Sequence, residues 1–149
     1  MVIVIGMKHI CVIDGQGGGI GGAIIKRIKA AYGETVEITA LGTNAIATAQ
    51  MLKARANRGA SGENAIVTTT RTADVVVGPV SIIIANALMG EVTPKIAKAV
   101  ADCPAQKILI PLFQENVALV GLTQDPLPPL LDAMIENHLN PICQEQNHV

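Results

Sequence analysis

The chain has almost no aromatic side chains: its 149 residues include one Tyr, one Phe and no Trp. The core must therefore be built from Ile, Val, Leu and Ala, which suits helices packed closely on a parallel sheet. Charge is also sparse, at 15% of residues with a formal net charge of -1. This balance indicates neither disorder nor a nucleic-acid-binding surface. The length is that of one ordinary domain with a single core.

A disulfide framework and a membrane segment are lacking as well. Cys11, Cys103 and Cys143 form no CxxC pair, and an odd count argues against paired cysteines. The apolar run at 80–89 is too short to span a bilayer, and the apolar residues 1–6 lack a charged region and a cleavage site. The sequence therefore predicts a cytoplasmic protein without a membrane partner.

Strand and helix patterns alternate along the chain. Buried strands are expected at 9–14, 35–41, 73–78, 107–112 and 117–121, and helices are expected from about residue 21, at 45–56, 81–89, 93–102 and 128–139. Residues 57–62 are expected to form a loop, and 66–70 either a strand or a short helix. This order predicts a three-layer, Rossmann-like α/β domain with a mostly parallel sheet of about five strands.

The predicted domain occupies residues 7–139. Residues 1–6 are interpreted as an N-terminal extension and 140–149 as a polar tail. Cys143, His148 and His138 lie near or in that tail, but their spacing fits no standard zinc pattern. No metal site is therefore predicted.

Six glycines lie within residues 15–22, between the first strand and the first helix. Glycine permits a positive φ in a tight turn and lets the backbone approach a ligand closely. The start of the helix adds unpaired N–H groups and a positive dipole end. The segment from Asp14 to Gly22 is therefore predicted to receive a phosphate or a similar anion.

Two familiar nucleotide loops fit this segment only in part. Gly17, Gly19 and Gly22 satisfy G-x-G-x-x-G, but residues 41–44 (LGTN) lack the acid that would hold a ribose, so NAD(P) is less favoured. A phosphate-loop NTPase needs a lysine where Ala23 stands. Asp14 binds N–H groups of the loop, binds a ligand hydroxyl, or approaches a phosphate through Mg²⁺.

Three motifs carry a family resemblance. VIDGQGGGIG at 12–21, ALGTNA at 40–45 and RGASGENA at 58–65 resemble an uncharacterised bacterial family of single-domain proteins. The resemblance covers the chain from Met7 to about Glu136. It implies no assigned activity.

The order of loops also resembles the nucleotide-binding half of the tubulin and FtsZ superfamily. The resemblance assigns Gly17 to Gly19 and Gly21 to the first loop, Thr43 and Asn44 to the second, and the 59–64 segment to the third. The fourth glycine-rich loop of that superfamily is replaced here by residues 78–82 (GPVSI), and the chain is too short for its second domain. The resemblance therefore implies binding of a purine nucleotide, with or without Mg²⁺, rather than hydrolysis or filament formation.

These observations favour a nucleotide-binding protein. A small dinucleotide-dependent enzyme and an oligomeric regulatory or assembly protein without catalysis are the alternatives, and no catalytic residue is assigned. A homo-oligomer is expected because the apolar 81–89 segment suits a subunit interface. Arg55, Arg58 or Arg71 could close on the ligand. The candidate ligand-binding residues are Asp14, Gly15, Gln16, Gly17, Gly18, Gly19, Ile20, Gly21, Thr43, Asn44, Gly59, Ala60, Ser61, Gly62, Asn64, Gly78, Pro79 and Ser81.

Overall fold

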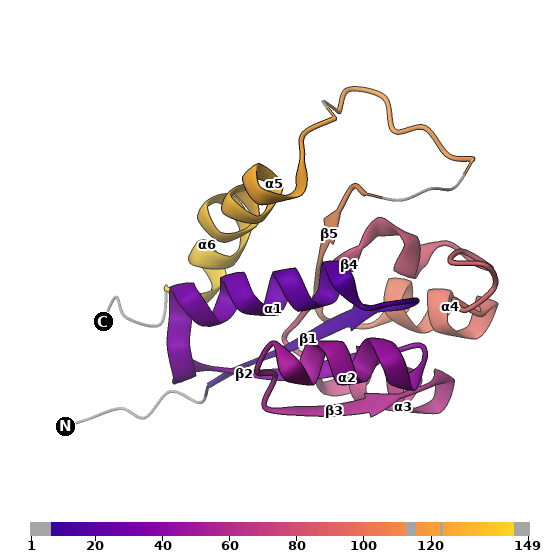
Figure 1. The fold of residues 1–149 in the computed structure, drawn as a ribbon, viewed down its shortest axis with the longest axis horizontal. Helices are drawn as coiled ribbons and strands as arrows, with labels where there is room; N and C mark the ends of the chain where they lie inside the picture. The colour runs from indigo at the N-terminus through magenta and orange to yellow at the C-terminus, as the bar shows by residue number, and fades with distance from the viewer. Residues whose placement is uncertain (1–6, 113–115, 123, 145–149) are drawn as a thin grey trace.

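The protein folds around a five-stranded sheet with the strand order β3-β2-β1-β4-β5 (Figure 1). The computed structural model describes residues 7–112, 116–122 and 124–144. All four strand pairs in this part of the chain are parallel. The α/β class and the parallel sheet predicted from the sequence are confirmed. The strands are β1 (Lys8–Asp14), β2 (Val36–Gly42), β3 (Arg58–Ser61), β4 (Val75–Pro79) and β5 (Gln106–Ile110).

Helices cover both faces of the sheet, so the domain has three layers and is Rossmann-like. One face carries α1 (Gly19–Tyr32), α2 (Ala45–Lys53), α5 (Leu127–Ala133), the π-helical turn η4 (Met134–Leu139) and α6 (Asn140–Cys143). The other carries α3 (Glu63–Thr69), α4 (Pro94–Asp102) and the short η3 (Val80–Ile83). The remaining turns are η1 (Gly33–Thr35) and η2 (Thr70–Thr72).

The central strand β1 is apolar on both faces. Ile10 and Val12 pack under α1, whereas Cys11 and Ile13 pack under α3 and α4. A strand with helices on both sides has no solvent-facing residues, and this accounts for the unbroken apolar pattern in the sequence. Burial also raises the pKa of the Cys11 thiol to about 12, so Cys11 is an inert part of the core.

The helix predicted at 81–89 is wrong. Only η3 is helical, and beyond Ile84 the chain forms a tight irregular turn in which Asn86, Leu88 and Met89 have positive φ angles. The β-branched side chains before Ile84 lower the helix propensity, and Asn86 tolerates the left-handed conformation that reverses the chain. This turn becomes one wall of the site described below.

The strand predicted at 117–121 is also wrong. These residues form an extended connection that pairs with no described strand, and Val120 is fully exposed. By contrast, the loop predicted at 57–62 contains β3, which pairs with β2. The ambiguous segment 66–70 lies in α3 and the turn that follows it.

The last helix begins where it was predicted and continues past Leu139 to Cys143. The extension at 1–6 and the final five residues of the predicted tail lie outside the described residues. Among the described helices, none is both long and apolar enough to cross a bilayer.

Candidate functional site

A cleft of about 750 Å³ opens at the carboxyl ends of β1 and β4. The chain leaves β1 toward one face of the sheet and β4 toward the other, and the gap between two such connections is where ligands bind in folds of this type. The β1–α1 loop forms one side and the turn after β4 forms the other. The lining residues are Asp14, Gly15, Gln16, Gly17, Gly18, Gly19, Ile20, Pro79, Ser81, Asn86, Leu88, Met89 and Leu112.

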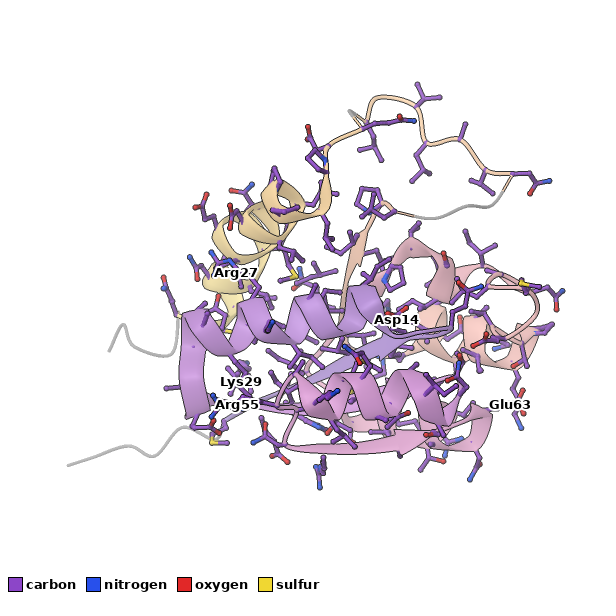
Figure 2. All side chains as sticks on the ribbon, viewed as in Figure 1. Asp14, Arg27, Lys29, Arg55 and Glu63 are labelled. Atoms are coloured by element: carbon purple, nitrogen blue, oxygen red, sulfur yellow. The ribbon has the colours of Figure 1, made fainter. Side chains whose placement is uncertain are left out.

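Asp14 holds the glycine-rich loop in shape. Its Oδ1 accepts a hydrogen bond from the N–H of Gly15 at 2.8 Å, and its Oδ2 accepts one from Gly21 at 2.7 Å. Burial raises the pKa of Asp14, the two backbone bonds oppose that rise, and the nearby charge of Glu91 adds to it. Figure 2 shows Asp14 at the start of α1. Of the roles predicted for Asp14, the structure shows the binding of loop N–H groups.

Three glycines of the loop are required by the protein's own packing. A Cβ on Gly15 would lie 2.6 Å from Thr43 Oγ1, and one on Gly21 would lie 2.6 Å from the Met51 sulfur. Gly18 has a positive φ of 72°, and a Cβ there would lie 2.8 Å from the backbone of Ala47 in α2. These positions are explained without a ligand.

Gly17 and Gly19 are different. A Cβ at either position would meet nothing within 4 Å, and neither residue has a positive φ. Their N–H groups have no hydrogen-bond partner among the described residues, and both lie exposed beside the cleft at the positive end of α1. The fold itself does not require glycine there, whereas close approach of a ligand does.

Ser81 contributes an unsatisfied polar group to the same cleft. Its side chain is 0% exposed, and its Oγ has no hydrogen-bond partner in the part of the chain that the structure describes. A buried hydroxyl without a partner costs about 1–3 kcal/mol. Ser81 lines the side of the cleft opposite the glycine-rich loop, so a bound ligand would offer its hydroxyl a hydrogen-bond partner.

Glu91 joins the loops that follow β1 and β2, and no sequence pattern singled it out. Its Oε1 accepts from Thr43 Oγ1 at 2.6 Å, from Asn44 Nδ2 at 2.7 Å and from the N–H of Gln16 at 2.9 Å. Burial raises the pKa of Glu91, but these three bonds outweigh burial and leave it below the ordinary value. The Glu91 carboxylate therefore holds Thr43 and Asn44 close to the glycine-rich loop. Thr43 and Asn44 are site candidates predicted from the sequence, whereas Glu91 is not.

The third predicted loop lies outside the cleft lining. Gly59, Ala60 and Ser61 belong to β3, and Ser61 Oγ is 2.7 Å from Thr48 Oγ1 of α2. Gly62 donates its N–H to the carbonyl of Gly42, and Asn64 lies at the exposed start of α3. The predicted residues at the end of β4 are partly in the cleft: Pro79 and Ser81 line it, while Gly78 packs against the carbonyl of Ile13.

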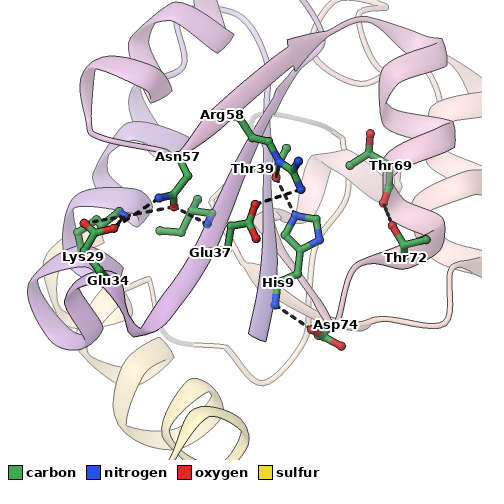
Figure 3. A network of polar contacts seen from close by, with 11 residues as sticks. His9, Lys29, Glu34, Glu37, Thr39, Asn57, Arg58, Thr69, Thr72 and Asp74 are labelled. Carbon is green, nitrogen blue, oxygen red and sulfur yellow. Dashed lines mark hydrogen bonds and ion pairs between the residues drawn. The ribbon is translucent and has the colours of Figure 1, made fainter. Parts of the chain in front are cut away.

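The predicted arginine helpers lie at the opposite end of the sheet. Figure 3 shows Arg58 beside the amino ends of the strands, where its guanidinium is 3.1 Å from Glu37 and its Nε donates to Thr39 Oγ1. His9 Nε2 is 2.7 Å from the same Thr39 oxygen. Figure 2 shows Arg55 far from Asp14, and Arg71 lies in η2 before β4 begins. None of the three lines the cleft.

The cleft thus offers uncharged hydrogen-bond donors and no positively charged side chain. Its lining includes no Lys, Arg or His, and its apolar wall comes from Leu88, Met89 and Leu112. The described residues also contain no group of three His, Cys, Asp or Glu side chains placed to hold a metal ion. A site of this kind binds through backbone N–H groups, a hydroxyl and apolar contact.

Fold and site together define a Rossmann-like α/β domain with a glycine-rich loop at its topological switch point. Residues 9–143 match the family described as a domain of unknown function (DUF3842), and the chain belongs to this family. No curated protein matches the sequence.

The crystal structure of a universal stress protein in complex with cAMP is similar to 67% of this chain and 94% of that chain, with 19% identity and a TM-score of 0.41. That similarity is too low to transfer a ligand.

Proposed function

We propose that the cleft binds a nucleotide, with a phosphate seated on the N–H groups of Gly17 and Gly19. The observation that carries the proposal is that the fold needs neither residue to be glycine. Free N–H groups at the N-terminus of a 14-residue helix attract an anion. The cleft volume falls within the usual range of about 300–1,000 Å³ for small-molecule sites.

The rest of the cleft supports a ligand larger than a bare phosphate. Leu88, Met89 and Leu112 offer apolar surface for a base, and Ser81 offers a buried hydroxyl for a polar atom of the ligand. Both oxygens of Asp14 are already engaged by the loop. We therefore propose binding as the function of the site and assign no catalytic step to it.

A binding measurement on glycine variants tests the proposal. Gly17→Ala and Gly19→Ala should leave the melting temperature unchanged or raise it, since each added methyl meets open space and reduces the entropy of the unfolded chain. Each should weaken nucleotide binding about tenfold or more, because the methyl occupies the position of the phosphate. Calorimetric titration with purine mononucleotides and dinucleotides measures the affinity.

Gly22→Ala is the matched control. Its methyl would meet Gln50 at 3.7 Å and Ala54 at 4.0 Å, which are ordinary contacts on the face of α1 that packs against α2. Affinity should stay at the wild-type value in this variant. The absence of any nucleotide binding to the wild type, with and without Mg²⁺, would overturn the proposal. Equal affinity in Gly19→Ala and Gly22→Ala would also contradict it.

Two broader expectations from the sequence are kept as proposals. The chain is proposed to form a homo-oligomer, supported by exposed apolar side chains such as Met89 and Val120. A cytoplasmic location is proposed from its unpaired cysteines. The resemblance of its loops to the tubulin and FtsZ superfamily stays a prediction.

A further inference from the structure

The glycine-rich loop offers few free donors, because most of its N–H groups are already bound within the protein. Gly15 and Gly21 donate to Asp14, and Gln16 donates to Glu91. Gly18 donates to the carbonyl of Gly15. Among the described residues, the donors left in the cleft are all uncharged: the N–H groups of Gly17 and Gly19, the Ser81 hydroxyl, and the side-chain amides of Gln16 and Asn86.

Two carboxylates stand beside these free donors. Glu91 accepts from the N–H of Gln16, directly before Gly17, and Asp14 accepts from the N–H of Gly21, two residues after Gly19, so an anion bound there lies near two negative side chains. Asp14 also offsets part of the positive end of α1. No lining Lys, Arg or His compensates for them.

We propose that the cleft selects a phosphate diester, which carries one negative charge, over a phosphate monoester or a polyphosphate. This inference rests on the proposed nucleotide function and names the class of ligand. These neutral donors suffice for the two unesterified oxygens of a diester. Each further charge is repelled by both carboxylates.

The test uses ligands that differ in one charge. Adenosine and guanosine 5′-monophosphates are compared with their phosphate methyl esters by calorimetric titration at neutral pH in metal-free buffer, with the free nucleosides as uncharged references. The ester should bind about tenfold more tightly than the monophosphate. The nucleoside should bind more weakly than the ester, because it lacks the anion that occupies the loop.

Glu91→Gln tests the cause of the preference. The amide oxygen can still accept from Thr43, Asn44 and Gln16, but the negative charge is gone. The preference for the ester should fall about threefold in this variant. Glu63→Gln is the matched control, since Glu63 accepts from Thr93 away from the cleft, and it should keep the wild-type preference.

The outcomes separate this inference from the proposed function. If the monophosphate binds as tightly as its ester, or more tightly, the charge selection is overturned while nucleotide binding stands. An unchanged preference in Glu91→Gln overturns it as well. If no member of either pair binds, both proposals fail.

Discussion

The residues of the cleft fall into two groups: those that the fold itself requires and those that it does not. Gly18 and Gly21 satisfy the protein's own backbone conformation and packing. Neither backbone conformation nor packing requires glycine at positions 17 and 19. The buried Ser81 hydroxyl has no hydrogen-bond partner among the described residues. A site is recognisable here because the unexplained residues lie together.

Glu91 should make the stability of the protein depend on pH in the acidic range. Its hydrogen bonds lower its pKa in the folded state below the ordinary value of 4.5. A carboxylate with a lowered folded pKa stabilises the protein above pH 4.5, and this contribution is lost as the pH falls through the folded pKa. The melting temperature of the wild type should therefore fall more steeply below about pH 4.5 than that of Glu91→Gln.

Asp14 titrates with the opposite sign, since its folded pKa is raised. Its contribution is greatest below the ordinary value of 3.8 and is lost as the pH rises through the folded pKa. Comparing the wild type with Glu91→Gln across the same pH series reports the effect of the Glu91 charge, including its effect on Asp14. Parallel melting curves for the two proteins would contradict the expected role of Glu91.

At the scale of elements, one side chain connects α3 to α4. Thr93 caps α4 by accepting from the N–H of Ile96 at 3.2 Å, and its hydroxyl donates to Glu63 Oε1 at the start of α3 at 2.6 Å. These helices cover the sheet face beside the cleft turn. The cap therefore stabilises the layer from which that turn extends.

Thr93→Val should lower the free energy of unfolding by about 1–2 kcal/mol, because it removes the cap and leaves Glu63 without that donor. Urea denaturation measures the change. Thr93→Ser keeps both hydrogen bonds and serves as the control, with a loss well below that of the valine variant. Equal losses in the two variants would show that the methyl group contributes as much as the hydroxyl and would contradict the expected role of the cap.

At the scale of the whole molecule, the sheet ends at the edge strand β5, which is suited to contact with another chain. On its side away from β4, strand β5 pairs with no described strand, and the connection at 117–122 places exposed apolar side chains near it. Leu119 and Leu122 line the same hollow as β5. An apolar edge of this kind is commonly covered by another chain.

Native mass spectrometry should show a homo-oligomer of the wild type. Val120→Asp combined with Leu122→Asp should shift it to the monomer, because a buried unpaired carboxylate is costly in an apolar interface. Ile46→Asp, on the exposed face of α2, is the matched control and should keep the wild-type mass. A wild-type monomer at micromolar concentration would contradict the expectation.

The sequence by itself determined the central strands, the first two helices and the loop between β1 and α1. An unbroken apolar run and a cluster of glycines between a strand and a helix are both local signals, because each is formed by residues that are neighbours in the sequence. The sequence therefore predicts Asp14, Gly17 and Gly19 in one ligand-binding loop, and these residues line the cleft.

The tertiary structure alone decided the wall opposite that loop. The sequence predicts a helix at 81–89, whereas the chain reverses near Asn86, and Glu91 beyond that turn accepts hydrogen bonds from Thr43 and Asn44. Those partners are 47 and 48 residues away in the chain, and sequence patterns report only neighbours along the chain. The short strand β3 was missed for the same reason, since its pairing with β2 and not its composition makes it a strand.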